Sequence, residues 1–287
     1  MARVQSSIHR PAVVLLHGLC SSSLEVLMFA RTLRDHGYHV ATPRIPGYTV
    51  GESLQGGAAN ATFERWIEAV TAEIATLASS HDAVHLCGVS LGATLGLAVA
   101  AHRVPGVTSL ALISTTLFFD GWNASRWRFL RPLAYYSPLG RLFAHREAAP
   151  YGVKNPRVRA WIEGQLAQSG LSSAGPARIP AATLREADRL IRFVKRSLPH
   201  VEVPVLLVHA REDDVASLAN PRFVARRIGS RVVHQTVVED SYHMITLDND
   251  RDLAALKTVQ FFSSVAQPRQ AEPWAAPATP TPSQAST

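Results

Sequence analysis

Cysteine, lysine and long apolar runs are all scarce in this chain, and each scarcity excludes a class of protein. Among 287 residues only Cys20 and Cys87 are cysteines, too few for a disulfide framework or a cysteine-based metal site. No apolar run approaches the roughly 20 residues that cross a membrane, and the first residues lack the apolar core of about 7–15 residues that marks a signal peptide. With 47% hydrophobic and 18% charged residues, the chain is not a disordered polyelectrolyte. We therefore expect a reduced, soluble, cytoplasmic protein.

Almost all of the positive charge comes from arginine, because only three of the 29 Lys and Arg residues are lysines. The formal net charge is +7, and residues 120–198 hold 14 Lys and Arg against five Asp and Glu. No nucleic-acid recognition motif accompanies this excess, so we expect no nucleic-acid partner. Four arginines of the segment are spaced to lie on one face of a helix: Arg185, Arg189, Arg192 and Arg196. This basic stripe either contacts anionic substrates or anionic lipid surfaces, or is a solvated helix face.

Short apolar strands alternate with amphipathic helices along most of the chain. The strand patterns cover residues 12–16, 38–41, 83–87, 110–113, 205–208 and 232–238, and most of them are apolar throughout. Such runs are typical of strands that are buried on both faces of a parallel sheet. Helical spacing of apolar residues covers 63–77, 91–101, 183–195 and 250–265, and Ser22 with Glu25 forms a capping-box pattern for a further helix that ends at Gly37. The alternation predicts the α/β class, with a mostly parallel, doubly wound sheet.

The pattern divides the chain into a core, an insertion and a tail. Residues 120–198 separate two strands by far more than an ordinary crossover, which predicts a helical cap, or lid, folded onto a core of residues 1–119 and 199–266. Residues 267–287 contain five prolines and predict a disordered tail. Aromatic residues gather where the insertion starts, and they either line an acyl pocket or form the core of the cap: Phe118, Phe119, Trp122, Trp127, Phe129, Tyr135 and Tyr136.

The segment Gly88-Val89-Ser90-Leu91-Gly92 lies between a predicted buried strand and a predicted helix. A nucleophile elbow needs this arrangement, because its tight turn holds the serine in strained backbone geometry and only glycine leaves room two residues to either side. The helix N-terminus then directs backbone amides and a positive dipole end at the serine. Ser90 is therefore a candidate nucleophile, and the alternative is a glycine-rich turn with an incidental serine.

A serine nucleophile needs a base and an acid, and candidates for both follow later strands. The acidic cluster Glu212-Asp213-Asp214 comes after the fifth predicted strand, and His243 lies in the loop after the last one. The carboxyl ends of parallel strands meet at one edge of a sheet, so these groups would gather near Ser90. His243 is the candidate base, and Asp213 is favoured over Asp214 as the acid, with Glu212 third. Otherwise the histidine is a structural surface residue and the unused acids form a solvated turn.

Two backbone amides are candidates for binding an oxyanion. Acyl transfer needs pre-aimed donors for the oxygen of its tetrahedral intermediate. The N–H of Leu91, at the start of the helix, is one, and the N–H of Leu19, in the loop after the first strand, is the other. His17 in the same loop is better placed to brace the loop than to act as a base.

Four motifs carry a resemblance to a known family. They are Leu-Leu-His-Gly at 15–18, Gly-Val-Ser-Leu-Gly at 88–92, Ala-Arg-Glu-Asp-Asp-Val at 210–215 and Ser-Tyr-His-Met-Ile-Thr-Leu-Asp at 241–248. Together they resemble the α/β-hydrolase superfamily, and more narrowly the chain is similar to bacterial carboxylesterases and monoacylglycerol lipases over about residues 11–265. The resemblance implies an α/β-hydrolase fold in which Ser90 is the nucleophile, Asp213 the acid and His243 the base. It also implies that the amides of Leu19 and Leu91 form the oxyanion hole.

These expectations describe a serine hydrolase of carboxylic esters that forms an acyl-enzyme intermediate. Its partner would be a small-molecule ester, either a short- to medium-chain acyl ester or a monoacylglycerol, and we expect no cofactor and no metal. A thioesterase or acyltransferase acting on anionic acyl carriers would use the same serine, and the basic insertion would suit it. A more remote alternative is a non-catalytic binding protein with the same fold. Nothing in the pattern indicates an oligomeric state.

Overall fold

Six parallel strands form the central sheet of the computed structural model, which describes residues 10–50, 62–125, 135–137, 144–146, 148–172 and 174–266. In sheet order they are β10 (Val233–Val238), β9 (Val205–Ala210), β4 (Val107–Ile113), β3 (Val84–Val89), β1 (Ala12–Leu16) and β2 (His39–Ala41). The chain starts at β1, passes to β2 at one edge, and then returns to β3 on the other side of β1. The winding therefore switches direction between β1 and β3, and ligands of such sheets bind at the carboxyl ends of the strands at this point.

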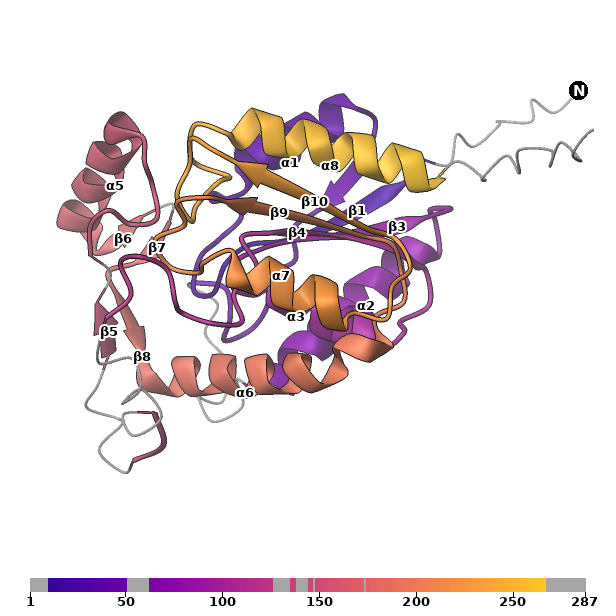
Figure 1. Cartoon of the computed structure of the whole chain (residues 1–287), viewed down its shortest axis with the longest axis horizontal. Coiled ribbons are helices and arrows are strands. Elements are labelled where there is room, and N and C mark those ends of the chain that lie inside the picture. The colour runs from indigo at the N-terminus through magenta and orange to yellow at the C-terminus, as the bar shows by residue number, and fades with distance from the viewer. Residues whose placement is uncertain are drawn as a thin grey trace, which may run out of the picture.

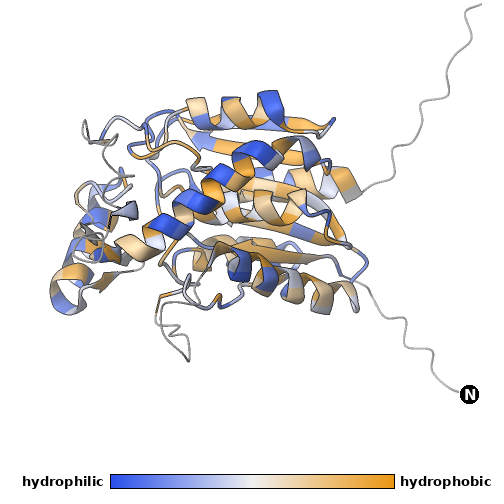
Figure 2. Cartoon of the chain, turned by 90° about the horizontal axis from the view of Figure 1, so that it is seen from below, coloured by the Kyte–Doolittle hydropathy of each residue, from blue (hydrophilic) through white to orange (hydrophobic). Residues whose placement is uncertain are grey.

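Helices cover both faces of the sheet (Figure 1). One face carries α1 (Leu27–Asp35) and α8 (Arg251–Ala266), and the other carries α2 (Phe63–Ala78), α3 (Leu91–Ala101), α6 (Ala181–Ser197) and α7 (Ala219–Arg227). Strand β1 is apolar throughout because both of its faces are buried. Val14 belongs to the hydrophobic cluster under α2 and α3, and Val13 belongs to the cluster under α1 and α8. Hydrophobic residues run along the strands between the helices in Figure 2. The predicted doubly wound α/β sheet is thus confirmed. None of the described helices is both long and apolar enough to span a bilayer.

Helix α6 packs with the core, although the sequence pattern assigned it to the inserted cap. Its buried residues, among them Leu190 and Val194, belong to the same hydrophobic cluster as α2, α3 and one face of the sheet. Its outer face is hydrophilic, as the helix at the front of Figure 2 shows. The amphipathic spacing predicted correctly that one face of this helix is buried, but periodicity carries no information on what covers that face.

The other described parts of the insertion lie beyond the carboxyl ends of the strands, at the left of Figure 1. They are α5 (Pro156–Ser169), the antiparallel pair β5 (Ala144–Arg146) and β8 (Arg178–Pro180), and the pair β6 (Leu171–Ser172) and β7 (Gly175–Pro176). The Asn155 side chain caps α5, and a small apolar cluster of Val153, Ile162 and Met244 joins α5 to the core. The predicted cap residues Trp127 and Phe129 and the predicted tail at 267–287 lie outside the described residues.

Helix α1 corrects the capping-box prediction. It begins at Leu27, and none of the described side chains caps its N-terminus. The Ser22 hydroxyl accepts a hydrogen bond from the Leu24 N–H (3.3 Å) in a local turn. Glu25 points into the protein, where it is fully buried and accepts a hydrogen bond from the Gly18 N–H (2.8 Å). A serine and a glutamate three residues apart fit a capping box, but here a buried amide elsewhere in the chain binds the carboxylate.

Buried His85 on β3 gives the fold a specific pH dependence. Its ring stacks on Phe262 (centroids 4.4 Å apart), and burial lowers the pKa of His85 from 6.5 to about 4. The folded state therefore keeps this ring neutral, while the unfolded chain protonates it below pH 6.5, so stability is lost as the pH falls from 6.5 towards 4. We expect the wild-type free energy of unfolding to drop by about 2 kcal/mol more than that of His85→Gln between pH 7 and pH 5. Urea unfolding of both proteins at the two pH values measures this, and identical pH slopes would contradict it.

Candidate active site

Ser90 occupies the sharp turn between β3 and α3. Its backbone has φ 54° and ψ −119°, a conformation that non-glycine residues rarely adopt. A Cβ on Gly88 would lie 2.4 Å from the Gly92 carbonyl oxygen, and a Cβ on Gly92 would lie 2.4 Å from the His17 carbonyl oxygen. Both glycines are therefore sterically required, and the turn presses the start of α3 against the end of β1.

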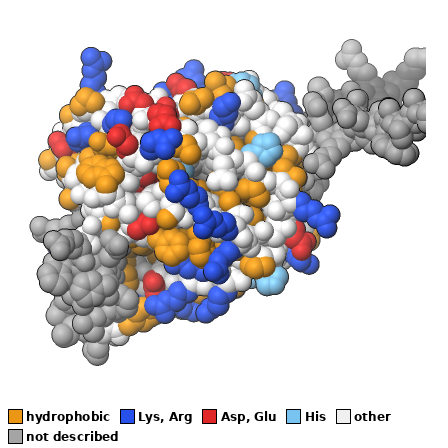
Figure 3. Space-filling model, in the orientation of Figure 1, with side chains coloured by type: hydrophobic (Ala, Val, Ile, Leu, Met, Phe, Trp, Pro, Cys, Tyr) orange, Lys and Arg blue, Asp and Glu red, His pale blue; other side chains and the backbone are white. Residues whose placement is uncertain are grey.

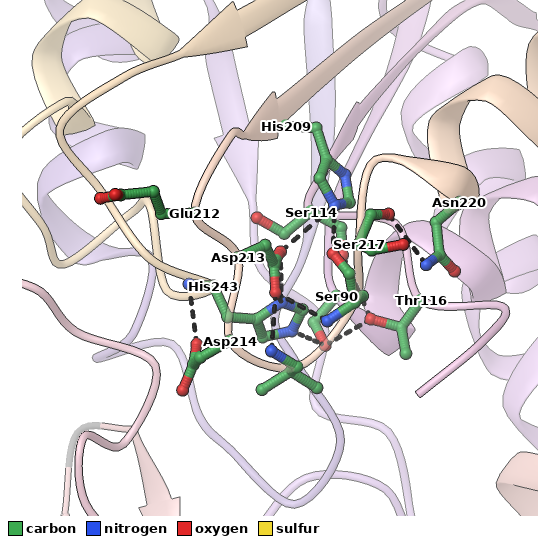
Figure 4. A network of polar contacts seen from close by, with 12 residues as sticks. Ser90, Ser114, Thr116, His209, Glu212, Asp213, Asp214, Ser217, Asn220 and His243 are labelled. Carbon is green, nitrogen blue, oxygen red and sulfur yellow. Dashed lines mark hydrogen bonds and ion pairs between the residues drawn. The ribbon is translucent and has the colours of Figure 1, made fainter. Parts of the chain in front are cut away.

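The Ser90 hydroxyl points at the His243 ring (Figure 4). Its Oγ lies 2.8 Å from Nε2 of His243 and 3.3 Å from Oγ1 of Thr116. On the other side of the ring, Nδ1 lies 2.8 Å and 3.0 Å from the two carboxylate oxygens of Asp213. A carboxylate can only accept hydrogen bonds, so the ring proton belongs on Nδ1, which leaves Nε2 free to accept the serine proton.

Asp213 and His243 shift each other's pKa because both are buried. Burial alone would raise the pKa of Asp213, but the charges of His243 and His209 and their hydrogen bonds hold it well below its ordinary value. Burial alone would lower the pKa of His243, but the charge of Asp213, with smaller contributions from Asp214 and Glu25, raises it above its ordinary value. The geometry thus keeps Asp213 ionised and makes His243 a stronger base than free imidazole.

His209 is a second histidine on Asp213, and the sequence pattern showed it only as a residue at the end of a strand. Its Nε2 lies 3.2 Å from Oδ2 of Asp213 and 2.6 Å from the carbonyl oxygen of Ala216. The other oxygen, Oδ1, accepts from the N–H groups of Val215 (2.9 Å) and Ala216 (2.7 Å). Both carboxylate oxygens therefore have fixed partners besides His243, which sets the orientation of the carboxylate.

The structure separates the three acids of the 212–214 cluster. Asp214 is buried, but it accepts from the backbone N–H of His243 (3.3 Å) instead of from the ring. Glu212 is exposed and forms an ion pair with Lys154 (2.6 Å). Of the three, Asp213 is the carboxylate that contacts the imidazole.

Asp248 holds the loop that carries His243. Its carboxylate accepts from the backbone N–H groups of Lys154, Asn155 and Tyr242 at 2.6–2.9 Å. The residue is 4% exposed, so these bonds are shielded from water. The histidine loop and the segment that leads into α5 are therefore fixed to one another.

A cavity of about 350 Å³ opens at Ser90. His243 and the predicted oxyanion residues Leu19 and Leu91 also line it. Leu91 is the first residue of α3, so its N–H has no acceptor within the helix. Most other lining side chains are apolar or aromatic, among them Phe119, Tyr135, Tyr151, Ile162, Leu166, Ile179, Leu184 and Met244. Phe119 and Tyr135 thus lie in the cavity wall, and Phe118 and Phe119 both pack against the core. Among the described residues, no group of three or more His, Cys, Asp and Glu side chains could hold a metal ion.

Lys and Arg side chains run across the middle and lower part of the face in Figure 3, where α7 and α6 lie. Within the predicted stripe, ion pairs join Arg189 to Glu186 and Glu64 (2.6 Å each), Arg192 to Asp188 (2.5 Å) and Arg185 to Glu186 (3.6 Å). These carboxylates neutralise much of the charge, so the stripe is less basic than its spacing alone predicts.

The parallel sheet, the strained serine turn and the serine–histidine–aspartate contacts at the carboxyl edge of the sheet are those of an α/β-hydrolase, the superfamily that the motifs indicated. More narrowly, the chain belongs to the serine aminopeptidase, S33 family, which it matches over residues 7–250.

Two curated relatives and one solved structure show what the chain is similar to. It is 24% identical over 252 residues to a thermostable monoacylglycerol lipase of Bacillus sp. (strain H-257), covering 88% of this chain and 90% of the relative. It is 28% identical over 262 residues to a pimeloyl-[acyl-carrier protein] methyl ester esterase of Aromatoleum aromaticum, covering 87% and 97%. The fold matches the crystal structure of a Paleococcus ferrophilus monoacylglycerol lipase with a TM-score of 0.71 at 17% identity, covering 88% and 94%. The family and fold expected from the motifs are therefore confirmed.

Proposed function

We propose that this chain hydrolyses carboxylic esters, with Ser90 as nucleophile, His243 as base and Asp213 as the acid that orients the base. The proposal rests on the unbroken contact from Ser90 Oγ to His243 Nε2 (2.8 Å) and from His243 Nδ1 to Asp213 (2.8 Å) at the wall of a largely apolar cavity. The similarity to an esterase and a lipase over most of the chain supports it.

In the acylation step, His243 removes the Ser90 proton while Oγ attacks the carbonyl carbon of the ester. The carbonyl oxygen takes up the negative charge and accepts hydrogen bonds from the N–H groups of Leu19 and Leu91. The protonated His243, stabilised by Asp213, then gives its proton to the departing alkoxide. The alcohol leaves and the acyl group stays on Ser90.

The deacylation step repeats this chemistry with water. His243 takes a proton from a water molecule as the water oxygen attacks the acyl carbonyl carbon. The second tetrahedral intermediate expels the Ser90 oxygen, which recovers its proton from His243. The carboxylic acid is released and the starting state is restored.

The cavity wall favours neutral esters with a short- to medium-chain acyl group, including monoacylglycerols. Its volume of about 350 Å³ and its apolar side chains suit a hydrocarbon chain. The carboxyl groups among the described lining residues are Glu25 and Asp214, and both accept hydrogen bonds from backbone N–H groups. Both carboxyl groups are also buried. A peptide with a free amino terminus would need an accessible carboxylate to bind its ammonium group, so this wall supports ester substrates over such peptides.

A second candidate is a thioesterase or acyltransferase that acts on anionic acyl carriers through the same serine. The Lys and Arg side chains over α6 and α7 favour it, because they would attract an acidic carrier. The similarity to an esterase of an acyl-carrier-protein methyl ester points in the same direction.

A substrate panel tests the proposal. Steady-state kinetics would compare p-nitrophenyl esters of about two to twelve carbons, monoacylglycerols, matched acyl-CoA thioesters and aminoacyl p-nitroanilides, with Ser90→Ala as the blank. We expect the highest kcat/KM on short- and medium-chain esters. Preference for the thioesters would favour the second candidate, preference for the anilides would contradict ester specificity, and no turnover of any substrate would favour a non-catalytic binding protein.

A further inference from the structure

Glu25 is a fully buried carboxyl group beside the loop that carries the predicted oxyanion amide of Leu19. Its Oε2 accepts a hydrogen bond from the Gly18 N–H at 2.8 Å, while its Oε1 has no hydrogen-bond partner within the described part of the chain. A Cβ placed on Gly18 would lie 3.2 Å from Oε2, so the carboxyl group lies directly against the glycine. Gly18, Leu19 and Glu25 all line the cavity at Ser90. A buried carboxyl group is costly to keep, which suggests that it has a task at this place.

The oxyanion loop, defined here as residues 17–21, is held from two sides. On one side the Tyr48 hydroxyl donates to the His17 carbonyl oxygen (2.9 Å), and the Tyr48 backbone carbonyl oxygen accepts from the Cys20 N–H (2.9 Å). His17 Nε2 also lies 2.9 Å from the Thr49 hydroxyl. On the other side, Glu25 binds the Gly18 N–H, which is the backbone amide directly before that of Leu19. The Gly18 N–H fixes the planar peptide unit between residues 17 and 18. The next unit, which carries the Leu19 N–H, is held at its Gly18 carbonyl oxygen by the Ser21 N–H (3.1 Å) and the His17 ring (2.7 Å). With both units held, the direction of the Leu19 N–H is set.

We propose that Glu25 is a positioning residue of the oxyanion loop: by holding the Gly18 N–H, it aims the Leu19 N–H at the carbonyl oxygen of a substrate on Ser90. This inference rests on the proposed ester hydrolysis and deepens it. The carboxyl group acts through the loop and does not touch the substrate. It matters most in the transition state, when the carbonyl oxygen carries its full negative charge.

The charge of Glu25 also reaches His243. Burial raises the pKa of Glu25 to about 7, against smaller opposing effects of Ser21, the Gly18 N–H and His243. In its ionised form Glu25 is one of the groups that raise the pKa of His243, after Asp213 and Asp214. Tyr48, on the far side of the loop, stays neutral because burial and the Glu25 charge raise its pKa. Removing the Glu25 charge therefore lowers the pKa of His243, and the acid limb of the activity profile moves to lower pH.

The test compares Glu25→Ala, Glu25→Gln and a control, Glu73→Gln on α2, which also removes one carboxylate. For each we would measure kcat, KM, the pH profile of kcat/KM and the inhibition constant of a trifluoromethyl ketone, which forms a tetrahedral oxyanion on the serine. In Glu25→Ala we expect kcat to fall by about 10- to 100-fold with KM within about twofold, and the inhibition constant to rise by the same factor as kcat falls. Glu25→Gln keeps an amide oxygen for the Gly18 N–H, so it should recover most of the lost kcat while its acid limb moves to lower pH.

Several results would overturn the inference. They are an unchanged kcat in Glu25→Ala, a loss expressed in KM alone, or a Glu25→Gln variant that recovers none of the lost kcat. If Glu25→Ala is not recovered folded, Glu25→Asp, whose shorter side chain withdraws the carboxylate from the Gly18 N–H, is measured against the same criteria. A wild-type protein without Ser90-dependent esterase activity would refute the proposed function itself. An active wild type with unchanged Glu25 variants would refute this inference alone.

Discussion

Replacing Ser90 with alanine is expected to lower kcat/KM on a simple ester by about 10⁴- to 10⁶-fold. The substitution removes the Oγ atom that lies 2.8 Å from His243 and leaves only substrate binding and the oxyanion amides. Alanine fits the same turn, so the melting temperature should stay close to that of the wild type. Initial rates on the best ester of the panel, together with a thermal melt, measure both quantities.

Ser114→Ala is the matched control for this substitution. Like Ser90, Ser114 has a positive φ (51°) and lies in the same polar region (Figure 4). It is fully buried, and its hydroxyl has no hydrogen-bond partner among the described residues. We expect its kcat/KM to stay within about threefold of wild type, because the reaction does not use its oxygen. Equal losses in Ser90→Ala and Ser114→Ala would show that the region tolerates no change, and would remove the support for Ser90 as nucleophile.

The second large effect is expected at Asp213. In Asp213→Asn the imidazole loses the carboxylate that accepts from Nδ1 at 2.8 Å, and the ring can turn to the wrong tautomer. We expect kcat to fall by about 10⁴-fold with a small change in KM. The adjacent Asp214→Asn keeps an oxygen for the His243 N–H, so its loss of kcat should stay below about tenfold.

This pair of variants separates the two neighbouring acids under matched conditions. Both remove one buried negative charge that raises the pKa of His243. Both should therefore move the acid limb to lower pH, but Asp213→Asn alone should abolish most of the rate. A loss in Asp214→Asn as large as that in Asp213→Asn would contradict the assignment of Asp213 as the acid.

Local patterns in the sequence were sufficient to predict the parallel sheet. They also singled out Ser90, the acidic cluster and His243 as candidate site residues. Apolar runs such as 12–16 predict strands buried on both faces, and a glycine two residues to either side of Ser90 predicts a strained turn. The structure places His243 in contact with Ser90, and Asp213 in contact with His243. The catalytic roles of the three residues stay predictions for the experiments above.

Residues that act through long-range contacts could not be predicted from these patterns. The spacing of Ser22 and Glu25 fitted a capping box. Spacing alone does not reveal that the Gly18 N–H binds the Glu25 carboxylate instead. The sequence pattern showed His209 only as a histidine at the end of a strand, and the fold brings its Nε2 to 3.2 Å from Oδ2 of Asp213. Helix α6 showed a buried face, but the neighbour that covers it is set by tertiary packing.

The central claim is that Ser90 is an activated nucleophile, and covalent labelling tests it most directly. The protein would be incubated with a fluorophosphonate and digested, and the modified peptide identified by mass spectrometry, with Ser90→Ala and Ser114→Ala treated in parallel. The account predicts a single adduct on the peptide that contains Ser90, equal labelling of Ser114→Ala and no labelling of Ser90→Ala. Absence of labelling in the wild type, or equal labelling of Ser90→Ala, would contradict it.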